Sequence, residues 1–341
     1  MRKEFILRLF IVVVIVGGIL AFNFIVDPFQ QYREPKLYKI GKWREEERYL
    51  NAGLIRNQKY DTILIGSSMT RNFSEEYIKN LFNWKTLKLT MSSGNQEDIK
   101  FVLDNIEKNK IKNLIIGIDL WAFESRKKEI EMPGYLYKEK LNLGDNWKYL
   151  SNIGTLKYSL KLVLYNIKYG EQIKDKFKLG YQYTYSKKRV LRNYGIKNIK
   201  LERNIKLDEV SKSLIKNYQE NLKYILELYK EKNIILFFPP YSILAYEDMI
   251  ANRKIEEYLS LKKYLVEDIE KYSNVKLYDF QDIKEITHNL DNYGDKSHYS
   301  PEISNKLLEF IKKDKYILNS ENVDERIKKL ETQLMNMDVE I

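Results

Sequence analysis

The chain has 341 residues and a formal net charge of +11, and its composition of 44% hydrophobic and 31% charged residues excludes an intrinsically disordered protein. It contains no cysteine and two histidines, so disulfides, thiolate metal sites and cysteine nucleophiles are excluded, and no metal or organic cofactor is predicted. Basic and acidic residues are interleaved, which favours solvated helix faces over a dedicated site for a polyanion.

Residues 1–29, MRKEFILRLFIVVVIVGGILAFNFIVDPF, predict a transmembrane signal anchor. Three basic residues precede a nearly continuous apolar run over 9–26, which is long enough to cross a bilayer and ends at Asp27-Pro28. The charge placement predicts a cytoplasmic N-terminus, a single pass through the cell membrane and an extracytoplasmic domain. A cleaved signal peptide is the alternative, although no small-x-small cleavage site follows the run.

After a predicted linker helix over 30–59, short apolar runs alternate with helical patterns. The runs TILIG, TLKLT, NLIIGIDL, NIILFF and VKLYDF are typical of buried parallel strands. Such alternation predicts a three-layer α/β/α domain over 60–315 with roughly five parallel strands.

Two segments depart from this alternation. Residues 125–206 contain scattered tyrosines and lysines and predict a largely helical insertion that lids or flanks a site. Its aromatic and basic residues could also stack on single-stranded nucleic acid, but the extracytoplasmic location argues against that, so no nucleic-acid partner is predicted. The tail over 316–341 predicts an amphipathic helix that packs on the domain in preference to forming a coiled coil, with its apolar stripe at Val323, Ile327, Leu330, Leu334 and Met337.

Gly66-Ser67-Ser68 ends the first predicted strand. The loop between a strand's carboxyl end and the next helix is where open α/β sheets place their sites. A serine there either acts as a nucleophile or only caps the following helix, and this stretch by itself favours neither role.

Asp295 and His298, three residues apart in NYGDKSHYSP, offer a base and a carboxylate that would orient it. They precede a helix that Pro301 helps to start. The other histidine, His288, has no comparable neighbours and is interpreted as a surface or loop residue.

Gly66-Ser67-Ser68 and Asp295-Lys-Ser-His298 resemble the first and last motifs of the SGNH/GDSL hydrolase superfamily, over roughly residues 60–123 and 233–313. The resemblance implies a flavodoxin-like SGNH fold in which Ser68 is the nucleophile, His298 the base and Asp295 its orienter. Ser67 stands where the family often has Asp. The anchored Gly-Ser-Ser form is similar to bacterial cell-envelope members, including the protein of teichoic-acid D-alanylation and partners of membrane-bound O-acyltransferases.

The second and third motifs of the family match this sequence less closely than the first and last. By resemblance, the backbone N–H groups of Ser68 and Gly94 would line an oxyanion hole, and Asn95 is a further donor candidate. The third motif of the family ends in Asn-Asp, whereas this chain has Gly117-Ile-Asp119 after its third strand. An ionised Asp119 cannot donate a hydrogen bond, so it is either a substrate contact or a structural carboxylate.

Two weaker candidates lie nearby. Arg71 could bind a phosphate or carboxylate of the substrate, and a surface or ion-pair role is equally compatible with its position. Pro239-Pro240 predicts a rigid loop after the fourth strand, where Tyr241 or Ser242 would line the site.

Two functions are therefore expected from the sequence. The first is a membrane-anchored serine esterase or O-acyltransferase that acts on acyl esters of envelope polysaccharide or teichoic acid, without a cofactor and with a membrane-bound O-acyltransferase as a possible partner. The second is a non-catalytic scaffold or binding component of an envelope polymer modification or export complex.

Overall fold

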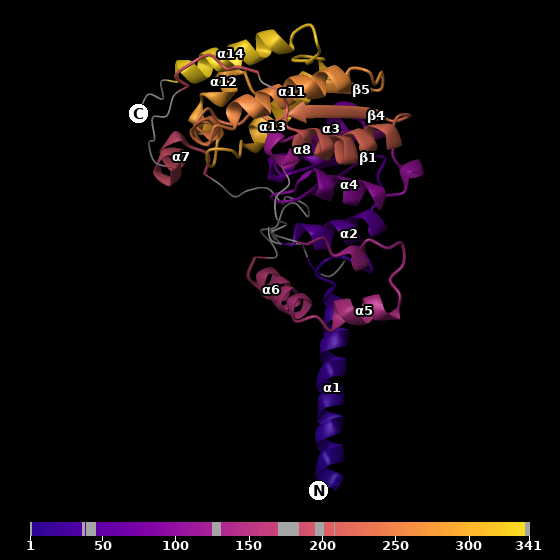
Figure 1. Cartoon of the computed structure of the whole chain (residues 1–341). Helices are drawn as coiled ribbons and strands as arrows, with labels where there is room; N and C mark the ends of the chain where they lie inside the picture. Colours follow the sequence, from indigo (N-terminus) through magenta and orange to yellow (C-terminus); the bar gives the residue numbers. More distant parts are fainter. Residues whose placement is uncertain are drawn as a thin grey trace. The chain divides into compact units, whose positions relative to one another are not determined.

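The computed structural model describes residues 2–35, 38, 46–124, 131–169, 184–194, 201–207 and 209–337. The chain divides into two units. Figure 1 shows the whole chain, coloured by residue number. Unit 1 contains residues 1–59 and 130–179, and unit 2 contains residues 60–129 and 180–341. The predicted insertion is therefore split: most of it belongs with the N-terminal segment, and its last part belongs with the α/β unit.

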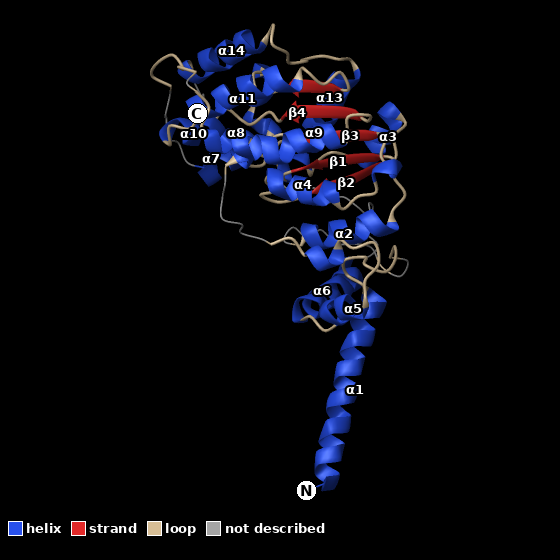
Figure 2. Cartoon of the chain, turned by 45° about the vertical axis from the view of Figure 1, so that its right-hand side comes forward, coloured by secondary structure: helices blue, strands red, loops and turns tan. Residues whose placement is uncertain are grey.

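Unit 2 is built on a five-stranded parallel sheet with the order β2-β1-β3-β4-β5 (Figure 2). Its strands are β1 (Thr62–Gly66), β2 (Thr86–Thr90), β3 (Asn113–Gly117), β4 (Asn233–Phe238) and β5 (Val275–Asp279). Each strand lies within one of the five predicted apolar runs, so the predicted α/β class with a five-stranded parallel sheet is confirmed. Every residue of β1 and β3 is buried, as expected for central strands covered on both faces.

Helices cover both faces of this sheet. Those of unit 2 are α3 (Glu75–Phe82), α4 (Gln96–Asp104), α7 (Lys187–Tyr194), α8 (Lys212–Tyr218), α9 (Tyr224–Leu228), α10 (Ala245–Ala251), α11 (Ile255–Ile269), α12 (Lys284–Thr287), α13 (Pro301–Lys312) and α14 (Val323–Met335). Right-handed crossovers place α3, between β1 and β2, on one face and α4, between β2 and β3, on the other. Accordingly, α13 contacts α3, and α4 contacts the π-helical turn that joins α8 to α9.

The sheet order reverses between β1 and β3. Open α/β sheets bind ligands in the crevice at the carboxyl ends of the strands that flank such a reversal. The loops that follow Gly66 and Gly117 therefore occupy the place where a site is expected.

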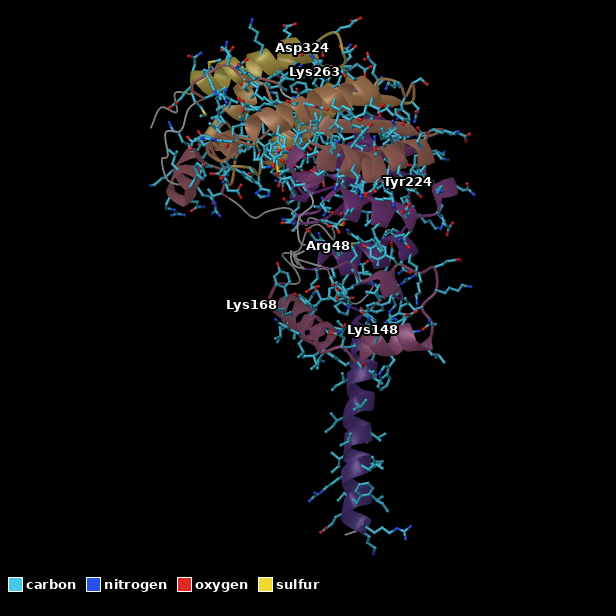
Figure 3. All side chains as sticks on the ribbon, viewed as in Figure 1. Arg48, Lys148, Lys168, Tyr224, Lys263 and Asp324 are labelled. Atoms are coloured by element: carbon cyan, nitrogen blue, oxygen red, sulfur yellow. The ribbon has the colours of Figure 1, made fainter. Side chains whose placement is uncertain are left out.

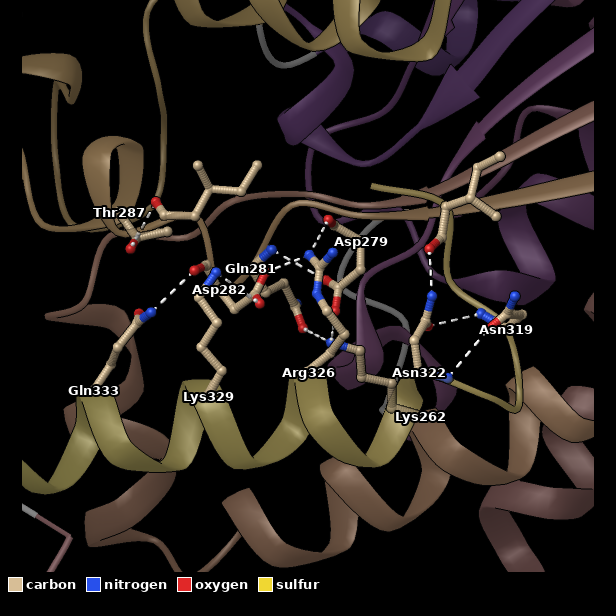
Figure 4. Close-up of polar contacts among 12 residues, drawn as sticks. Lys262, Asp279, Gln281, Asp282, Thr287, Asn319, Asn322, Arg326, Lys329 and Gln333 are labelled. Atoms are coloured by element: carbon tan, nitrogen blue, oxygen red, sulfur yellow. Dashed lines mark hydrogen bonds and ion pairs between the residues drawn. The ribbon is translucent and has the colours of Figure 1, made fainter. Parts of the chain in front are cut away.

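The C-terminal helix α14 packs on unit 2 and contacts α11. Arg326 donates a 2.7 Å hydrogen bond to the carbonyl of Asp279 and pairs with the buried carboxylate of Asp282 (Figure 4). Lys263 on α11 forms a 2.6 Å ion pair with Asp324 (Figure 3). The residues of the predicted apolar stripe are all buried: Val323, Ile327, Leu330, Leu334 and Met337.

Unit 1 contains α1 (Arg2–Val26), α2 (Glu47–Asn57), α5 (Leu143–Leu150) and α6 (Ile153–Tyr169). Helix α1 is long and apolar enough to cross a membrane, with a mean hydropathy of 2.9 over its best 18 residues, of which 11% are buried. It ends where Asp27-Pro28 predicts. The Asp27 carboxylate accepts the N–H groups of Gln31 and Tyr32 and the hydroxyl of Tyr149, and burial raises its pKa.

Candidate active site

The loop that follows β1 carries Ser68 and fits tightly against the ends of two strands. Thr70 donates its hydroxyl to the carbonyl of Ser67, and its methyl group lies over Gly66 and Gly117. A Cβ atom would lie 2.6 Å from this methyl carbon at Gly66 and 2.9 Å from it at Gly117. Glycine at both strand ends therefore allows the serine loop to approach the sheet closely.

Ser68, His298 and Asp295 form a hydrogen-bonded triad. Ser68 Oγ lies 2.9 Å from His298 Nε2, and His298 Nδ1 lies 2.7 Å from Asp295 Oδ2. Ser67 Oγ instead accepts the backbone N–H of Met69 at 3.1 Å, so it caps the short turn Ser68–Thr70. The structure thus brings together the three residues predicted as nucleophile, base and orienter.

The loop of residues 294–298 holds the Asp295 carboxylate ionised. Asp295 Oδ1 accepts the backbone N–H groups of Ser297 and His298, each at 2.9 Å, as well as the imidazole contact. Burial would raise the pKa of Asp295, but these hydrogen bonds and the charge of His298 outweigh it and lower the pKa to about 2. The Asp-x-x-His spacing works because one tight turn lets a single carboxylate bind both the backbone and the ring of the histidine.

Two contacts that the sequence analysis missed connect the serine and histidine loops. The buried hydroxyl of Tyr299 donates to the carbonyl of Met69 at 2.7 Å. Asn72 Nδ2 donates to the carbonyl of Tyr299 and, at 3.0 Å, to the hydroxyl of Tyr185. The residue after Ser68 is thus bound to the residue after His298, which fixes the separation of Ser68 and His298.

The loop after β4 supports the histidine loop from another direction. Tyr293 donates its hydroxyl to the carbonyl of Pro240 at 2.9 Å, and Ser242 Oγ donates to the carbonyl of Lys296 at 2.6 Å. Tyr241 and Ser242 are both buried, so they brace the site and do not line an open surface. Helix α7 adds a contact from Arg189 Nε to the carbonyl of Gly294 at 3.0 Å.

Asp119 lies in the interior of unit 2, with 2% of its surface exposed. It accepts hydrogen bonds from the hydroxyls of Tyr241 and Ser67, and Trp121 Nε1 donates to Tyr241 at 3.1 Å. Burial raises the pKa of Asp119, and the two hydrogen bonds offset this only in part. These contacts favour the structural role that the sequence analysis left open, because the carboxylate binds the serine loop from within.

The predicted oxyanion donor Gly94 is already engaged. Its N–H donates to the carbonyl of Met91 at 3.0 Å, so the loop after β2 forms a turn and does not offer that N–H to a substrate. The carbonyl Oδ1 of Asn95 caps α4 by accepting the N–H of Asp98 at 2.9 Å. The assignment of Gly94 is therefore wrong for this arrangement of the loop, because a local turn uses the hydrogen bond.

Arg71 is 1% exposed, which excludes the surface role and makes direct binding of a substrate anion incompatible with this conformation. Its guanidinium donates to Ser92 Oγ in the loop after β2. The neighbouring backbone is held by Lys88, whose ammonium donates to the carbonyls of Arg71 and Phe73 at 2.8 and 2.7 Å. Arg71 therefore connects the serine loop to the loop after β2.

The second histidine does not join the site. His288 is half-buried beside Thr287, and burial lowers its pKa to about 4. Among the residues that the structure describes, no cluster of three or more His, Asp or Glu side chains could hold a metal ion.

No family model, curated protein or solved structure matches this chain.

Proposed function

We propose that this protein is a serine esterase or O-acyltransferase with an acyl-enzyme intermediate on Ser68. The observation that carries the proposal is the unbroken series of contacts from Ser68 Oγ through His298 to Asp295, at 2.9 and 2.7 Å. A hydroxyl, an imidazole and a carboxylate in this order form the arrangement that activates a serine nucleophile on many unrelated folds. The carboxyl end of the sheet, beside its reversal point, is also where such a site is expected.

In the proposed reaction, Ser68 Oγ attacks the carbonyl carbon of an acyl ester while His298 Nε2 takes the hydroxyl proton. The tetrahedral intermediate collapses, the ester C–O bond breaks, and His298 returns the proton to the leaving alcohol. Water or an acceptor hydroxyl then attacks the acyl-enzyme, with His298 again removing the proton, and Ser68 is regenerated. Asp295 holds the imidazole so that Nε2 faces the serine.

The oxyanion requires donors other than Gly94. The N–H of Ser68 has no partner among the described residues, and it adjoins the reacting oxygen. Asn95 contributes its amide group when the loop after β2 presents Nδ2, because only its Oδ1 is used in capping α4. Loss of one oxyanion donor typically reduces the rate by about 10²–10³-fold. An oxyanion hole with two donors, where the superfamily has three, therefore predicts a low turnover rate.

The substrate class and location follow from the anchor and from the resemblance to the SGNH/GDSL superfamily. Helix α1 spans the cell membrane once, its N-terminus is cytoplasmic, and unit 2 lies outside the cytoplasm. The substrates are acyl esters of envelope polysaccharide or teichoic acid, and the partner is a membrane-bound O-acyltransferase. No nucleic acid and no cofactor take part.

Cleavage of aryl and sugar acyl esters by the full-length protein in detergent or nanodiscs tests the proposal. The wild type is compared with Ser68→Ala, Ser67→Ala and His298→Gln, each checked for folding by thermal unfolding. We expect activity to disappear in Ser68→Ala and His298→Gln and to persist in Ser67→Ala at a reduced level. Equal activity in the wild type and Ser68→Ala would exclude the proposal.

A non-catalytic scaffold is the second candidate, and two observations favour it. Asp119 stands where the superfamily has an amide donor, and the N–H of Gly94 is engaged by Met91. A scaffold would still bind an acylated glycan, but with equal affinity in the wild type and Ser68→Ala and without turnover. Binding measurements with acylated and deacylated oligosaccharide, combined with product analysis, separate the two functions.

A further inference from the structure

Helices α5 and α6 of unit 1 carry a set of large apolar side chains that remain exposed. Their exposed fractions range from 49% to 90%. The residues are Leu143 and Trp147 on α5, and Ile153, Leu160, Leu164 and Ile167 on α6. We call these six residues the apolar face. Isolated exposed apolar residues are common on proteins, but six on two consecutive helices of one unit need an explanation.

Helix α6 has one exposed apolar side and one buried side. At 100° per residue, its four members of the apolar face fall within an arc of about 60°. The opposite side of α6 carries Thr155, Tyr158, Ser159 and Leu162, all of which are buried. One side of the helix therefore packs within unit 1, and the other presents aliphatic side chains outward.

The C-terminal end of α5 and a residue within α6 are bound to the end of the membrane-spanning candidate α1. Asn23, a fully buried residue near the C-terminus of α1, donates through Nδ2 to the carbonyl of Leu150 at 2.7 Å. Its Oδ1 accepts the hydroxyl of Ser159 on α6 at 2.8 Å. Helix α1 contacts both α5 and α6, which lie beside its upper end in Figures 1 and 2. When α1 spans a bilayer, these contacts hold the apolar face at the membrane surface.

Basic residues accompany the apolar face. Lys148 on α5 lies 4.3 Å from the ring centre of Tyr135, and Lys161 on α6 lies 5.0 Å from that of Tyr158. Lys157 and Lys168 are exposed on α6 and project within about 60° of the aliphatic arc. Figure 3 labels Lys148 and Lys168 on the two helices. Tryptophan, aliphatic residues and lysines on the same helices are typical of segments that lie in the interface of an anionic membrane.

We propose that α5 and α6 form a membrane-surface element whose apolar face inserts into the leaflet at the C-terminal end of α1. The occupant of this face is the lipid bilayer, with anionic headgroups near the lysines. This inference depends on the proposed role of α1 as an anchor, and it does not depend on any chemistry at Ser68. With this element, three helices would hold unit 1 in one orientation at the membrane, whereas α1 by itself would leave unit 1 free to rotate.

The absence of cysteine makes single-cysteine spin labelling of the full chain direct. Labels are placed at Ile153, Leu164 and Ile167 of the apolar face in nanodiscs of phosphatidylglycerol and phosphatidylethanolamine. Val13→Cys on α1 is the lipid reference, and Leu207→Cys, at an exposed leucine of unit 2, is the aqueous reference. All five positions are exposed, so the substitutions should leave the fold intact. Each label is tested for collisions with oxygen, which concentrates in lipid, and with a water-soluble nickel chelate.

We expect the ratio of oxygen to nickel accessibility at the three α6 positions to be several times that at Leu207 and to approach that at Val13. Nickel accessibility at these positions equal to that at Leu207 would overturn the proposal, and the face would then be a site for a protein partner. Aqueous exposure of Val13 as well would overturn the anchor and the proposal together. None of these readouts uses esterase activity, so failure here leaves the proposed reaction untouched.

Discussion

The hydroxyl of Tyr299 donates a 2.7 Å hydrogen bond to the carbonyl of Met69, so the residue after His298 is bound to the residue after Ser68. The two loops come from opposite ends of unit 2, 230 positions apart in the sequence. Their separation decides whether His298 reaches Ser68 Oγ. Tyr299 is therefore a positioning residue, although it touches no reacting atom.

Substitution Tyr299→Phe should reduce turnover more than a substitution elsewhere that destabilises the protein by the same amount. The change leaves a buried carbonyl without its donor and should lower the free energy of unfolding by about 1–3 kcal/mol. Displacement of one loop should also reduce kcat by roughly 10- to 100-fold, with little change in KM. Tyr229→Phe is the matched control, because Tyr229 is equally buried and donates to the carbonyl of Leu103 at 2.9 Å. Full activity in both variants would show that the contact does not position the triad.

Asp295→Asn should reduce kcat by about 10⁴-fold, since an amide cannot hold the imidazole in the tautomer that leaves Nε2 free to accept a proton. Asp291→Asn, four residues earlier in the chain, is the control, because among the described residues its side chain accepts only the N–H of Lys187. Ester cleavage measured at neutral pH compares the two variants. A loss of less than tenfold in Asp295→Asn would contradict the assigned orienter.

The depressed pKa of Asp295 also predicts a dependence of stability on pH. Its folded-state pKa of about 2 lies below its ordinary value of 3.8, so the unfolded chain binds more protons between these two pH values. The stabilisation should be present above about pH 4 and be lost as the pH falls through about 2. The unfolding midpoints of the wild type and Asp295→Asn, measured from pH 6 to pH 2, should therefore converge on acidification. A constant difference across this range would contradict the pKa shift.

Asp119 predicts a dependence of the opposite sign. Its pKa is raised above 3.8 by burial, so the native state binds more protons than the unfolded chain above about pH 4. As the pH rises from 4, the wild type should therefore lose stability relative to Asp119→Asn, which cannot ionise. Urea unfolding of both proteins from pH 4 to pH 8 gives this difference directly. An increase in the relative stability of the wild type with pH would show that Asp119 is ionised without cost.

Gly66 tests the tight fit of the serine loop. Gly66→Ala places a methyl carbon 2.6 Å from Thr70 Cγ2, which should cost about 1–3 kcal/mol of stability and most of the activity. Thr70→Ser removes Cγ2 and keeps the hydroxyl that binds Ser67. The double variant should therefore recover most of the stability lost in Gly66→Ala. Additive losses in thermal unfolding would place the strain elsewhere, such as at the carbonyl of Gly117, 3.2 Å away.

The strands and the triad could be predicted because their signals are local. A fully buried parallel strand is a short apolar run, and Asp295 and His298 lie within one turn that the sequence displays. The contacts of Tyr299, Tyr241 and Arg71 could not be predicted, since each connects segments that only the tertiary fold brings together. Gly94 is assigned as an oxyanion donor by resemblance, whereas in the structure its N–H donates to Met91. A glycine after a strand can donate its N–H within a local turn as readily as to an oxyanion.

Fluorophosphonate labelling of the full-length protein, followed by mass spectrometry of the peptide that contains Ser67 and Ser68, shows whether Ser68 is the nucleophile. We expect covalent label on Ser68 in the wild type, its loss in Ser68→Ala and in His298→Gln, and its retention in Ser67→Ala. Label on Ser67, or a folded wild type that stays unlabelled under conditions in which a control serine esterase reacts fully, would contradict this assignment.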